Sequence, residues 1–115
     1  MNNTLETVLL ITRNGMGSAD PALQITLIQK YLQLLLDGDL LPSVICFYTE
    51  GVKLVVEGSP ILDLLRKFES KGVHLAVCST CLSFLGLQDL IQVGIVGGMP
   101  DIIEAQWGAK KVITL

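Results

Sequence analysis

The chain has 115 residues, of which half are hydrophobic and 17% are charged, and its formal net charge at pH 7 is −3. A sequence of this length corresponds to one domain with room for a single sheet and its covering helices. Its lysines and arginines are scattered, and the basic stripe that would indicate nucleic-acid binding is absent from the sequence. The mean hydropathy of +0.59 is high for a small soluble domain, so we expect a surface for self-association.

The sequence predicts neither a membrane span nor a secretion leader. The longest uncharged stretch, residues 72–88, is interrupted by polar residues and glycines, whereas a span needs about 20 mostly apolar residues. Residues Met1 to Glu6 contain no basic region and no cleavage-like site, so we expect a cytoplasmic protein. Three cysteines in such a chain do not form a disulfide framework, and at least one thiol is expected to be free.

Short β-branched runs alternate with helical patterns along the chain, so we expect a single domain, residues 1–115. The expected strands are residues 7–12, 44–48, 73–77, 93–96 and 111–114. Their hydrophobic residues are continuous rather than alternating, which is typical of strands covered on both faces of a parallel sheet. The order predicts an α/β fold of three layers, a mostly parallel five-stranded sheet flanked by helices with flavodoxin/Rossmann-like layering.

Proline at a first helical position predicts helices that start at Asp20-Pro21, Ser59-Pro60 and Met99-Pro100. The first of these helices, Pro21 to Asp37, is unusual because its large hydrophobic residues cover more than one face. It is either buried deeply in the monomer or forms a contact between subunits. In a chain this short we favour the subunit contact.

Cys78 follows directly after the strand 73–77, where parallel α/β sheets gather their reactive groups. The apolar segment 81–85, which begins with Cys81, predicts a helix just beyond it. Unpaired N–H groups and the positive end of a helix dipole at such a junction favour the thiolate, the reactive form of cysteine. Most free cysteines instead behave as small buried hydrophobic residues. We prefer that interpretation for Cys46, which lies in mid-strand, and a functional one for Cys78.

The C-x-x-C spacing is compatible with several chemistries. Structural zinc needs about four ligands, and three cysteines with a single histidine make it improbable, so we expect no metal and no cofactor. A dithiol–disulfide switch between Cys78 and Cys81 and persulfide transfer by Cys78 both stay open. His74 lies four residues before Cys78, roughly 13 Å along a strand, so we expect a structural histidine rather than a catalytic base.

Two further loops are expected to wall the cleft around Cys78. One is the glycine-rich segment 14–20, which has neither the dinucleotide-binding fingerprint nor a P-loop. The other follows the second strand, and its lysine is a candidate cation for activating the thiol, although a solvated lysine is an equally good interpretation. The candidate substrate-binding residues of the two loops are Asn14, Gly15, Met16, Gly17, Tyr48, Gly51 and Lys53.

With these residues assembled, the chain resembles the DsrE/DsrF-like (DsrE family) sulfur-relay proteins over residues 8–113. The closest likeness is to the DsrE-like C-terminal domain of YedF-type selenium-metabolism, sulfurtransferase-like proteins. The segments that carry the resemblance are Met16-Gly17, Phe47-Tyr48-x-x-Gly51-Val52-Lys53-Leu54, Val56-Glu57-Gly58-Ser59 and Cys78-Ser79-Thr80-Cys81-Leu82-x-Phe84-x-Gly86-Leu87. The resemblance implies a five-stranded DsrE-like fold, trimers or hexamers, and a persulfide-accepting cysteine after a strand.

The resemblance also implies which cysteine carries the sulfur. In TusD-like relay members the reactive cysteine precedes a glycine by eight positions, and Cys78 and Gly86 match that spacing. Cys81 has no equivalent in those members, and it is left open whether it resolves or tunes Cys78. YedF-type proteins usually carry an N-terminal TusA-like domain, which this sequence does not show, so a separate TusA-like carrier is the expected partner.

We therefore predict a sulfur-carrier or sulfurtransferase-like protein that accepts and passes on a persulfide sulfur at Cys78. A dithiol redox protein using Cys78 and Cys81 is one alternative, and a non-catalytic oligomeric assembly module is the other. The residues do not select selenium over sulfur.

Overall fold

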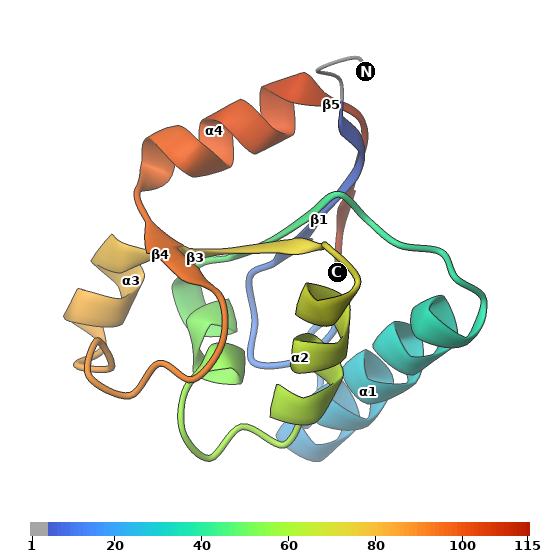
Figure 1. The fold of residues 1–115 in the computed structure, drawn as a ribbon. Helices are drawn as coiled ribbons and strands as arrows, with labels where there is room; N and C mark the ends of the chain where they lie inside the picture. The colour runs from blue at the N-terminus through green and yellow to red at the C-terminus, as the bar shows by residue number, and fades with distance from the viewer. Residues whose placement is uncertain (1–4) are drawn as a thin grey trace.

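The structure, a computed structural model, describes residues 5–115. Residues 1–4, where the sequence predicts no secretion leader, lie outside the described residues. Its elements follow one another in a regular alternation of strands and helices (Figure 1). They are β1 (Leu5–Ile11), α1 (Pro21–Asp37), β2 (Val44–Phe47), the 3-10 helix η1 (Thr49–Val55), α2 (Leu62–Ser70), β3 (His74–Cys78), α3 (Ser79–Phe84), β4 (Ile95–Gly97), α4 (Met99–Gly108) and β5 (Ala109–Thr114).

The five strands form one sheet in the order β4-β3-β2-β1-β5, and every neighbouring pair is parallel. In the central register Ile45 lies opposite Leu9 on one side and Leu75 on the other. Each expected strand is present, with ends that differ by a few residues. The predicted three-layer α/β fold is confirmed: α4 covers one face of the sheet, and α1 and α2 cover the other (Figure 1).

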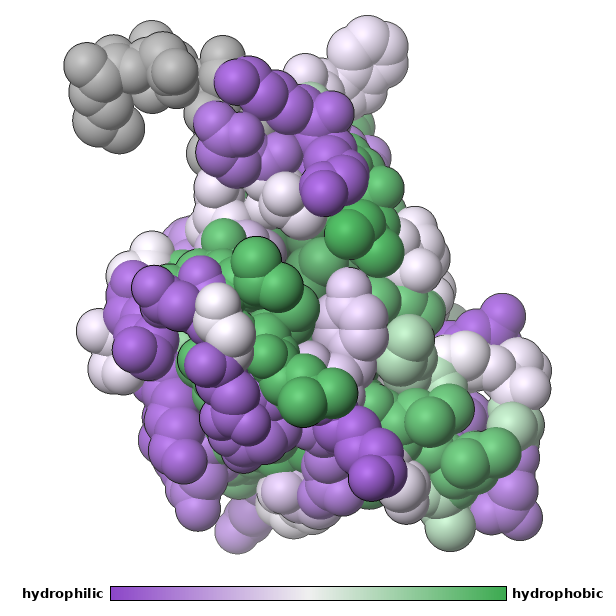
Figure 2. All heavy atoms as spheres, turned by 90° about the vertical axis from the view of Figure 1, so that its right-hand side faces the viewer, coloured by the Kyte–Doolittle hydropathy of each residue, from purple (hydrophilic) through white to green (hydrophobic). Residues whose placement is uncertain are grey.

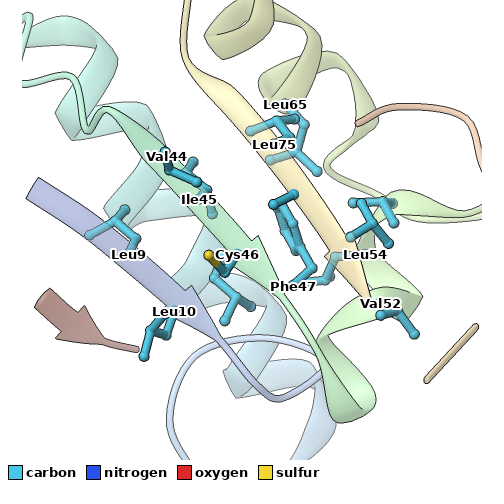
Figure 3. Packing of buried hydrophobic residues seen from close by; sticks show 14 of the residues in the cluster. Leu9, Leu10, Val44, Ile45, Cys46, Phe47, Val52, Leu54, Leu65 and Leu75 are labelled. Carbon is cyan, nitrogen blue, oxygen red and sulfur yellow. The ribbon is translucent and has the colours of Figure 1, made fainter. Parts of the chain in front are cut away.

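The core lies on both faces of the central strands, which explains their uninterrupted hydrophobic runs. All four residues of β2 are buried, and Phe47 and Leu75 are among the largest fully buried side chains (Figure 3). Cys46 is completely buried in the same cluster. Its interpretation as a small hydrophobic residue is therefore confirmed.

Two of the three predicted helix starts are confirmed. Asp20 Oδ1 accepts a hydrogen bond from the Ala22 N–H at 2.9 Å and caps α1, and α4 begins at Met99 with Pro100 in its first turn. The start at Ser59-Pro60 is wrong, because α2 begins only at Leu62. Ser59 Oγ accepts from the Ile61 N–H instead, so residues 59–61 form a turn ahead of the helix.

Helix α1 is not buried deeply in the monomer. Ile28 and Leu32 are its fully buried residues, whereas Leu23 and Leu34 are 48% and 67% exposed. The side of the molecule that carries α1 and β5 shows a broad hydrophobic area between polar margins (Figure 2). The monomer therefore leaves an apolar face of α1 uncovered, as a helix that contacts another subunit would have.

Among the helices of residues 5–115, none is both long enough and apolar enough to cross a lipid bilayer.

Candidate functional site

Strand β3 carries Cys78 to the carboxyl edge of the sheet. Cys78 is the last residue of the strand and immediately precedes helix α3, while His74 is the first residue of the same strand. The two side chains are thus at opposite ends of β3, as the sequence predicts. His74 is exposed, however, and not packed in the core as a structural histidine would be.

The C-x-x-C spacing brings two free thiols together. Cys78 occupies the N-cap position of α3 and Cys81 lies three residues on, and side chains at these two positions face each other across the first turn. The two thiols are adjacent, and Cys78 is one of the groups that raise the pKa of Cys81. Their surroundings differ: Cys78 is only 1% exposed, whereas Cys81 is partly exposed.

A backbone amide from another part of the chain contacts the second thiol. The Thr49 N–H, at the start of η1, donates to Cys81 Sγ at 3.1 Å. Thr49 has a φ of 49°, a left-handed conformation that is uncommon for a β-branched residue. Its hydroxyl anchors that conformation by donating its one proton to a hydrogen bond shared between the carbonyl oxygens of Thr12 and Tyr48.

Gly51 allows η1 to approach the end of β1. A Cβ atom at this position would lie 2.0 Å from the carbonyl oxygen of Ile11, so no other residue fits without moving the backbone. The Tyr48 N–H donates to the same Ile11 oxygen at 3.2 Å. The structure thus gives Gly51, a predicted substrate-binding residue, a buried position that holds Thr49 in place.

The electrostatic environment of Cys81 favours the neutral thiol. Burial raises the pKa of Cys81 above its ordinary value, the interaction with the adjacent Cys78 thiol raises it further, and the Thr49 amide lowers it. The Thr49 N–H is therefore the contact on Cys81 that favours the thiolate. Burial alone raises the pKa of Cys46 to about 11.

A cavity of about 340 Å³ opens beside Cys81. The described residues that line it are Thr49, Glu50, Thr80, Cys81, Phe84 and Leu85, and Cys78 is not among them. Apart from the Glu50 carboxylate its wall is mostly apolar, and Phe84 is 89% exposed at its rim. Lys53 Nζ pairs with Glu50 Oε1 at 3.1 Å on the same helix η1.

The residues of the glycine-rich loop do not line this cavity. Asn14 and Lys53 line a neighbouring hollow that shares Glu50 with it. Gly15 packs against Gln24 of α1 so closely that a Cβ would clash at 2.5 Å, and the Met16 N–H donates to the Gln24 carbonyl. Gly17 is exposed and Tyr48 is partly buried beside the core.

The candidate residues named from the sequence did not include Thr49, Glu50 or Phe84, although Thr49 and Glu50 belong to the loop 48–53 that was expected to wall the cleft. Thr49 and Glu50 stand between two residues that the sequence singles out, Tyr48 and Gly51, and Phe84 lies one turn of helix beyond Cys81. Within residues 5–115, no three histidine, cysteine or acidic side chains gather in a way that could hold a metal ion.

The sequence model of the DsrE/DsrF-like family matches residues 7–115, nearly the whole chain. The protein belongs to the DsrE/DsrF-like family. No curated protein shows a significant sequence match to it.

Solved structures of similar shape support the DsrE/DsrF-like fold. The YchN protein from E. coli superimposes with a TM-score of 0.70 at 15% identity, covering 96% of this chain and 99% of that one. A protein of unknown function from Methanobacterium thermoautotrophicum, MTH1491, has a TM-score of 0.65 at 21% identity, with 96% and 98% coverage. BT1422 from Bacteroides thetaiotaomicron, also of unknown function, has a TM-score of 0.66 at 14% identity, with 96% and 95% coverage. At these identities the likeness concerns the fold.

The site of this DsrE/DsrF-like chain is suited to sulfur exchange. It combines two adjacent thiols, one buried and one facing an apolar cavity, with an amide that stabilises negative charge on the outer sulfur. A thiolate at such a position can attack a sulfur–sulfur bond and can also leave from one.

Proposed function

We propose that this DsrE/DsrF-like protein is a sulfur carrier, close to the DsrE-like domain of YedF-type proteins, that accepts a persulfide sulfur and passes it on with Cys78 as the holding residue. The observation that carries the proposal is the pair of contacting thiols beside an apolar cavity, with Cys78 only 1% exposed. A persulfide held at a buried sulfur is shielded from the small thiols of the cytoplasm, because exchange requires access to the sulfur. The eight-residue spacing from Cys78 to Gly86 supports the same choice of residue.

The partner in this proposal is a protein, a TusA-like sulfur carrier. The cavity beside Cys81 is bordered by the exposed ring of Phe84, and an exposed aromatic at the rim of an apolar cavity is typical of a protein-binding surface. A carrier protein that brings its own persulfide on a mobile segment could insert the segment there.

The proposal includes self-association of the chain, as a trimer or hexamer, through α1. Leu23, Leu27 and Leu34 of this helix are exposed. The side of the molecule that carries α1 and β5 has a broad hydrophobic area (Figure 2). A second copy of the chain would cover these side chains and reduce the apolar surface that so small a domain exposes to water. Mass measurement in dilute solution tests this part: Leu34→Glu should lower the mass of the wild-type assembly, and a stable wild-type monomer would refute it.

The carrier proposal is tested by incubation with a persulfide donor, followed by intact-mass and peptide mass measurements. The wild type should gain one sulfur that is found on Cys78, and a Cys46→Ala control should gain it equally. A wild type that gains no sulfur, or a Cys78→Ser/Cys81→Ser double variant that gains as much as the wild type, would reject the proposal. A dithiol redox protein would instead cycle between the thiols and a disulfide without retaining an added sulfur.

A further inference from the structure

The two thiols of the pair differ in their access to a partner. Cys81 lines the cavity and is partly exposed, whereas Cys78 lies behind it with 1% exposure. Building on the proposed function, we propose that sulfur arrives on Cys81, which the Thr49 amide positions for the reaction, and moves from there to Cys78.

Access to the sulfur atom carries the first part of this proposal. An attacking thiolate must approach the sulfur that it attacks along the axis of the bond that breaks. A donor protein whose persulfide enters the cavity meets Cys81 at the wall, while Cys78 is only 1% exposed and does not line the cavity. The two cysteines face each other across the first turn of α3, which puts Cys78 within reach of a sulfur that is bound to Cys81.

The two transfers balance without an oxidant or a reductant. In the first, the Cys81 thiolate attacks the outer sulfur of the donor persulfide, and the donor's sulfur–sulfur bond breaks. The donor leaves as a thiolate and takes up the proton that Cys81 has lost. In the second, the Cys78 thiolate attacks the outer sulfur on Cys81, the bond to Cys81 breaks, and Cys81 recovers the proton that Cys78 has lost. Running the same steps in reverse delivers the sulfur to an acceptor.

The Thr49 amide carries the second part of the proposal. In both transfers negative charge is present on Cys81, first as the attacking and then as the leaving thiolate, and the Thr49 N–H points at that sulfur from 3.1 Å. The other ionisable groups that face Cys81 are Cys78 on β3 and Glu50 on η1. Lys53 pairs with Glu50 and offsets its charge, and α3 itself contains no charged residue. Thr49 is therefore a positioning residue that acts through its backbone.

The order of the two cysteines is tested by following sulfur loading over time with a persulfide donor. Cys81→Ser should slow the loading of Cys78 by about tenfold or more, because the accessible thiol is gone. Cys78→Ser should acquire sulfur on Cys81 at close to the wild-type rate and lose it faster to a small thiol. Ser83→Ala, at an exposed position of α3, is the control and should load as the wild type does.

Two results would overturn this order while leaving the carrier proposal intact. In one, the Cys81→Ser variant gains sulfur as fast as the wild type; in the other, the Cys78→Ser variant gains no sulfur at all. A wild type that never loads would instead remove the proposed function itself.

The positioning role of Thr49 is tested by the pH profile of Cys81 alkylation in a Cys46→Ala/Cys78→Ser background, where Cys81 is the single thiol. Thr49→Gly keeps the left-handed backbone accessible but removes the hydroxyl that anchors it, so the profile should move up by about one pH unit. Thr49→Ser retains the hydroxyl and should leave the profile in place. Thr26→Val, which removes a hydroxyl bonded to the Ala22 carbonyl on α1, is the matched control and should not move it either. A folded Thr49→Gly variant with an unchanged profile would refute the role.

Discussion

The backbone N–H of Thr49 donates a hydrogen bond to the sulfur of Cys81 at 3.1 Å, although 32 positions separate the two residues in the sequence. The contact is possible because β2 and β3 are parallel neighbours, so the segments that follow them emerge side by side at one edge of the sheet. The reactivity of the thiol therefore depends on the position of η1, and several measurable consequences follow from that dependence.

Gly51→Ala should destabilise the protein and slow the alkylation of Cys81. The added Cβ would lie 2.0 Å from the Ile11 carbonyl oxygen, so η1 must move away from β1 and take the Thr49 amide with it. We expect a loss of about 2 kcal/mol or more in the free energy of unfolding, measured with urea. Gly108→Ala is the control, because open space surrounds that position and its stability should change little. Equal stability of the two variants would contradict this account of Gly51.

Mild oxidation should join Cys78 to Cys81 within one chain. The two thiols are already in contact, whereas Cys46 is buried within β2. The oxidised protein should lose two hydrogens in intact mass and keep one thiol that is alkylated only after unfolding. Cys46→Ala should form the same disulfide and Cys81→Ser should not. Disulfides found only between chains would show that the contact is not maintained in solution.

Stability should fall at alkaline pH because of Cys46. Burial raises the pKa of its thiol from 9.0 to about 11 in the folded protein, so the unfolded chain releases this proton first as the pH rises. The stabilisation is complete below about pH 9 and is lost as the pH rises through about 11, with a total of about 3 kcal/mol. Urea unfolding at intervals across this range measures it. Cys46→Ala should be less stable throughout but have a shallower decline, and an equally steep decline would contradict the assignment.

Phe84→Ala should slow sulfur transfer from a protein donor more than transfer from a small persulfide. The ring is 89% exposed at the rim of the cavity. A docking protein would contact the ring, whereas a small persulfide would reach Cys81 without binding to it. Trp107→Ala is a matched control, since this indole is 86% exposed on α4. Comparison of the two donors with each variant checks the prediction. Equal slowing with both donors would mean that Phe84 acts on the chemistry and not on docking.

The layers of the fold were predictable from local patterns. Uninterrupted hydrophobic runs such as residues 44–47 reflect burial on both faces of a strand, and Asp20-Pro21 marks a helix start through a side-chain cap. The start of α2 was not predictable in this way, because Ser59 bonds to the Ile61 N–H in a turn that resembles a helix cap in sequence. Local rules identify the residue types of a cap but not where the helix behind it begins.

The cysteines were found at the strand end that the sequence indicates, but their different surroundings were not predictable. Cys78 ends β3 and is only 1% exposed, whereas Cys81 lies in the helix that follows and lines the cavity. The Thr49 contact is a long-range one, and it needs a positive φ at a residue type that rarely adopts it. Neither the burial of Cys78 nor the contact between Thr49 and Cys81 produces a periodic pattern in the sequence from which it could be predicted.

The direction of β1 has a consequence for any protein that is fused ahead of this domain. Leu5 pairs with Ala109 at the amino edge of the sheet, while the two cysteines lie at the carboxyl edge. The seven residues of β1 put these edges roughly 23 Å apart at about 3.3 Å per residue. A carrier domain fused at this end would therefore need a linker of at least about seven extended residues to bring its own sulfur to Cys81. A freely diffusing carrier has no such length requirement. A short rigid fusion at this end would hold the sulfur of the carrier at the amino edge of the sheet, away from the two cysteines.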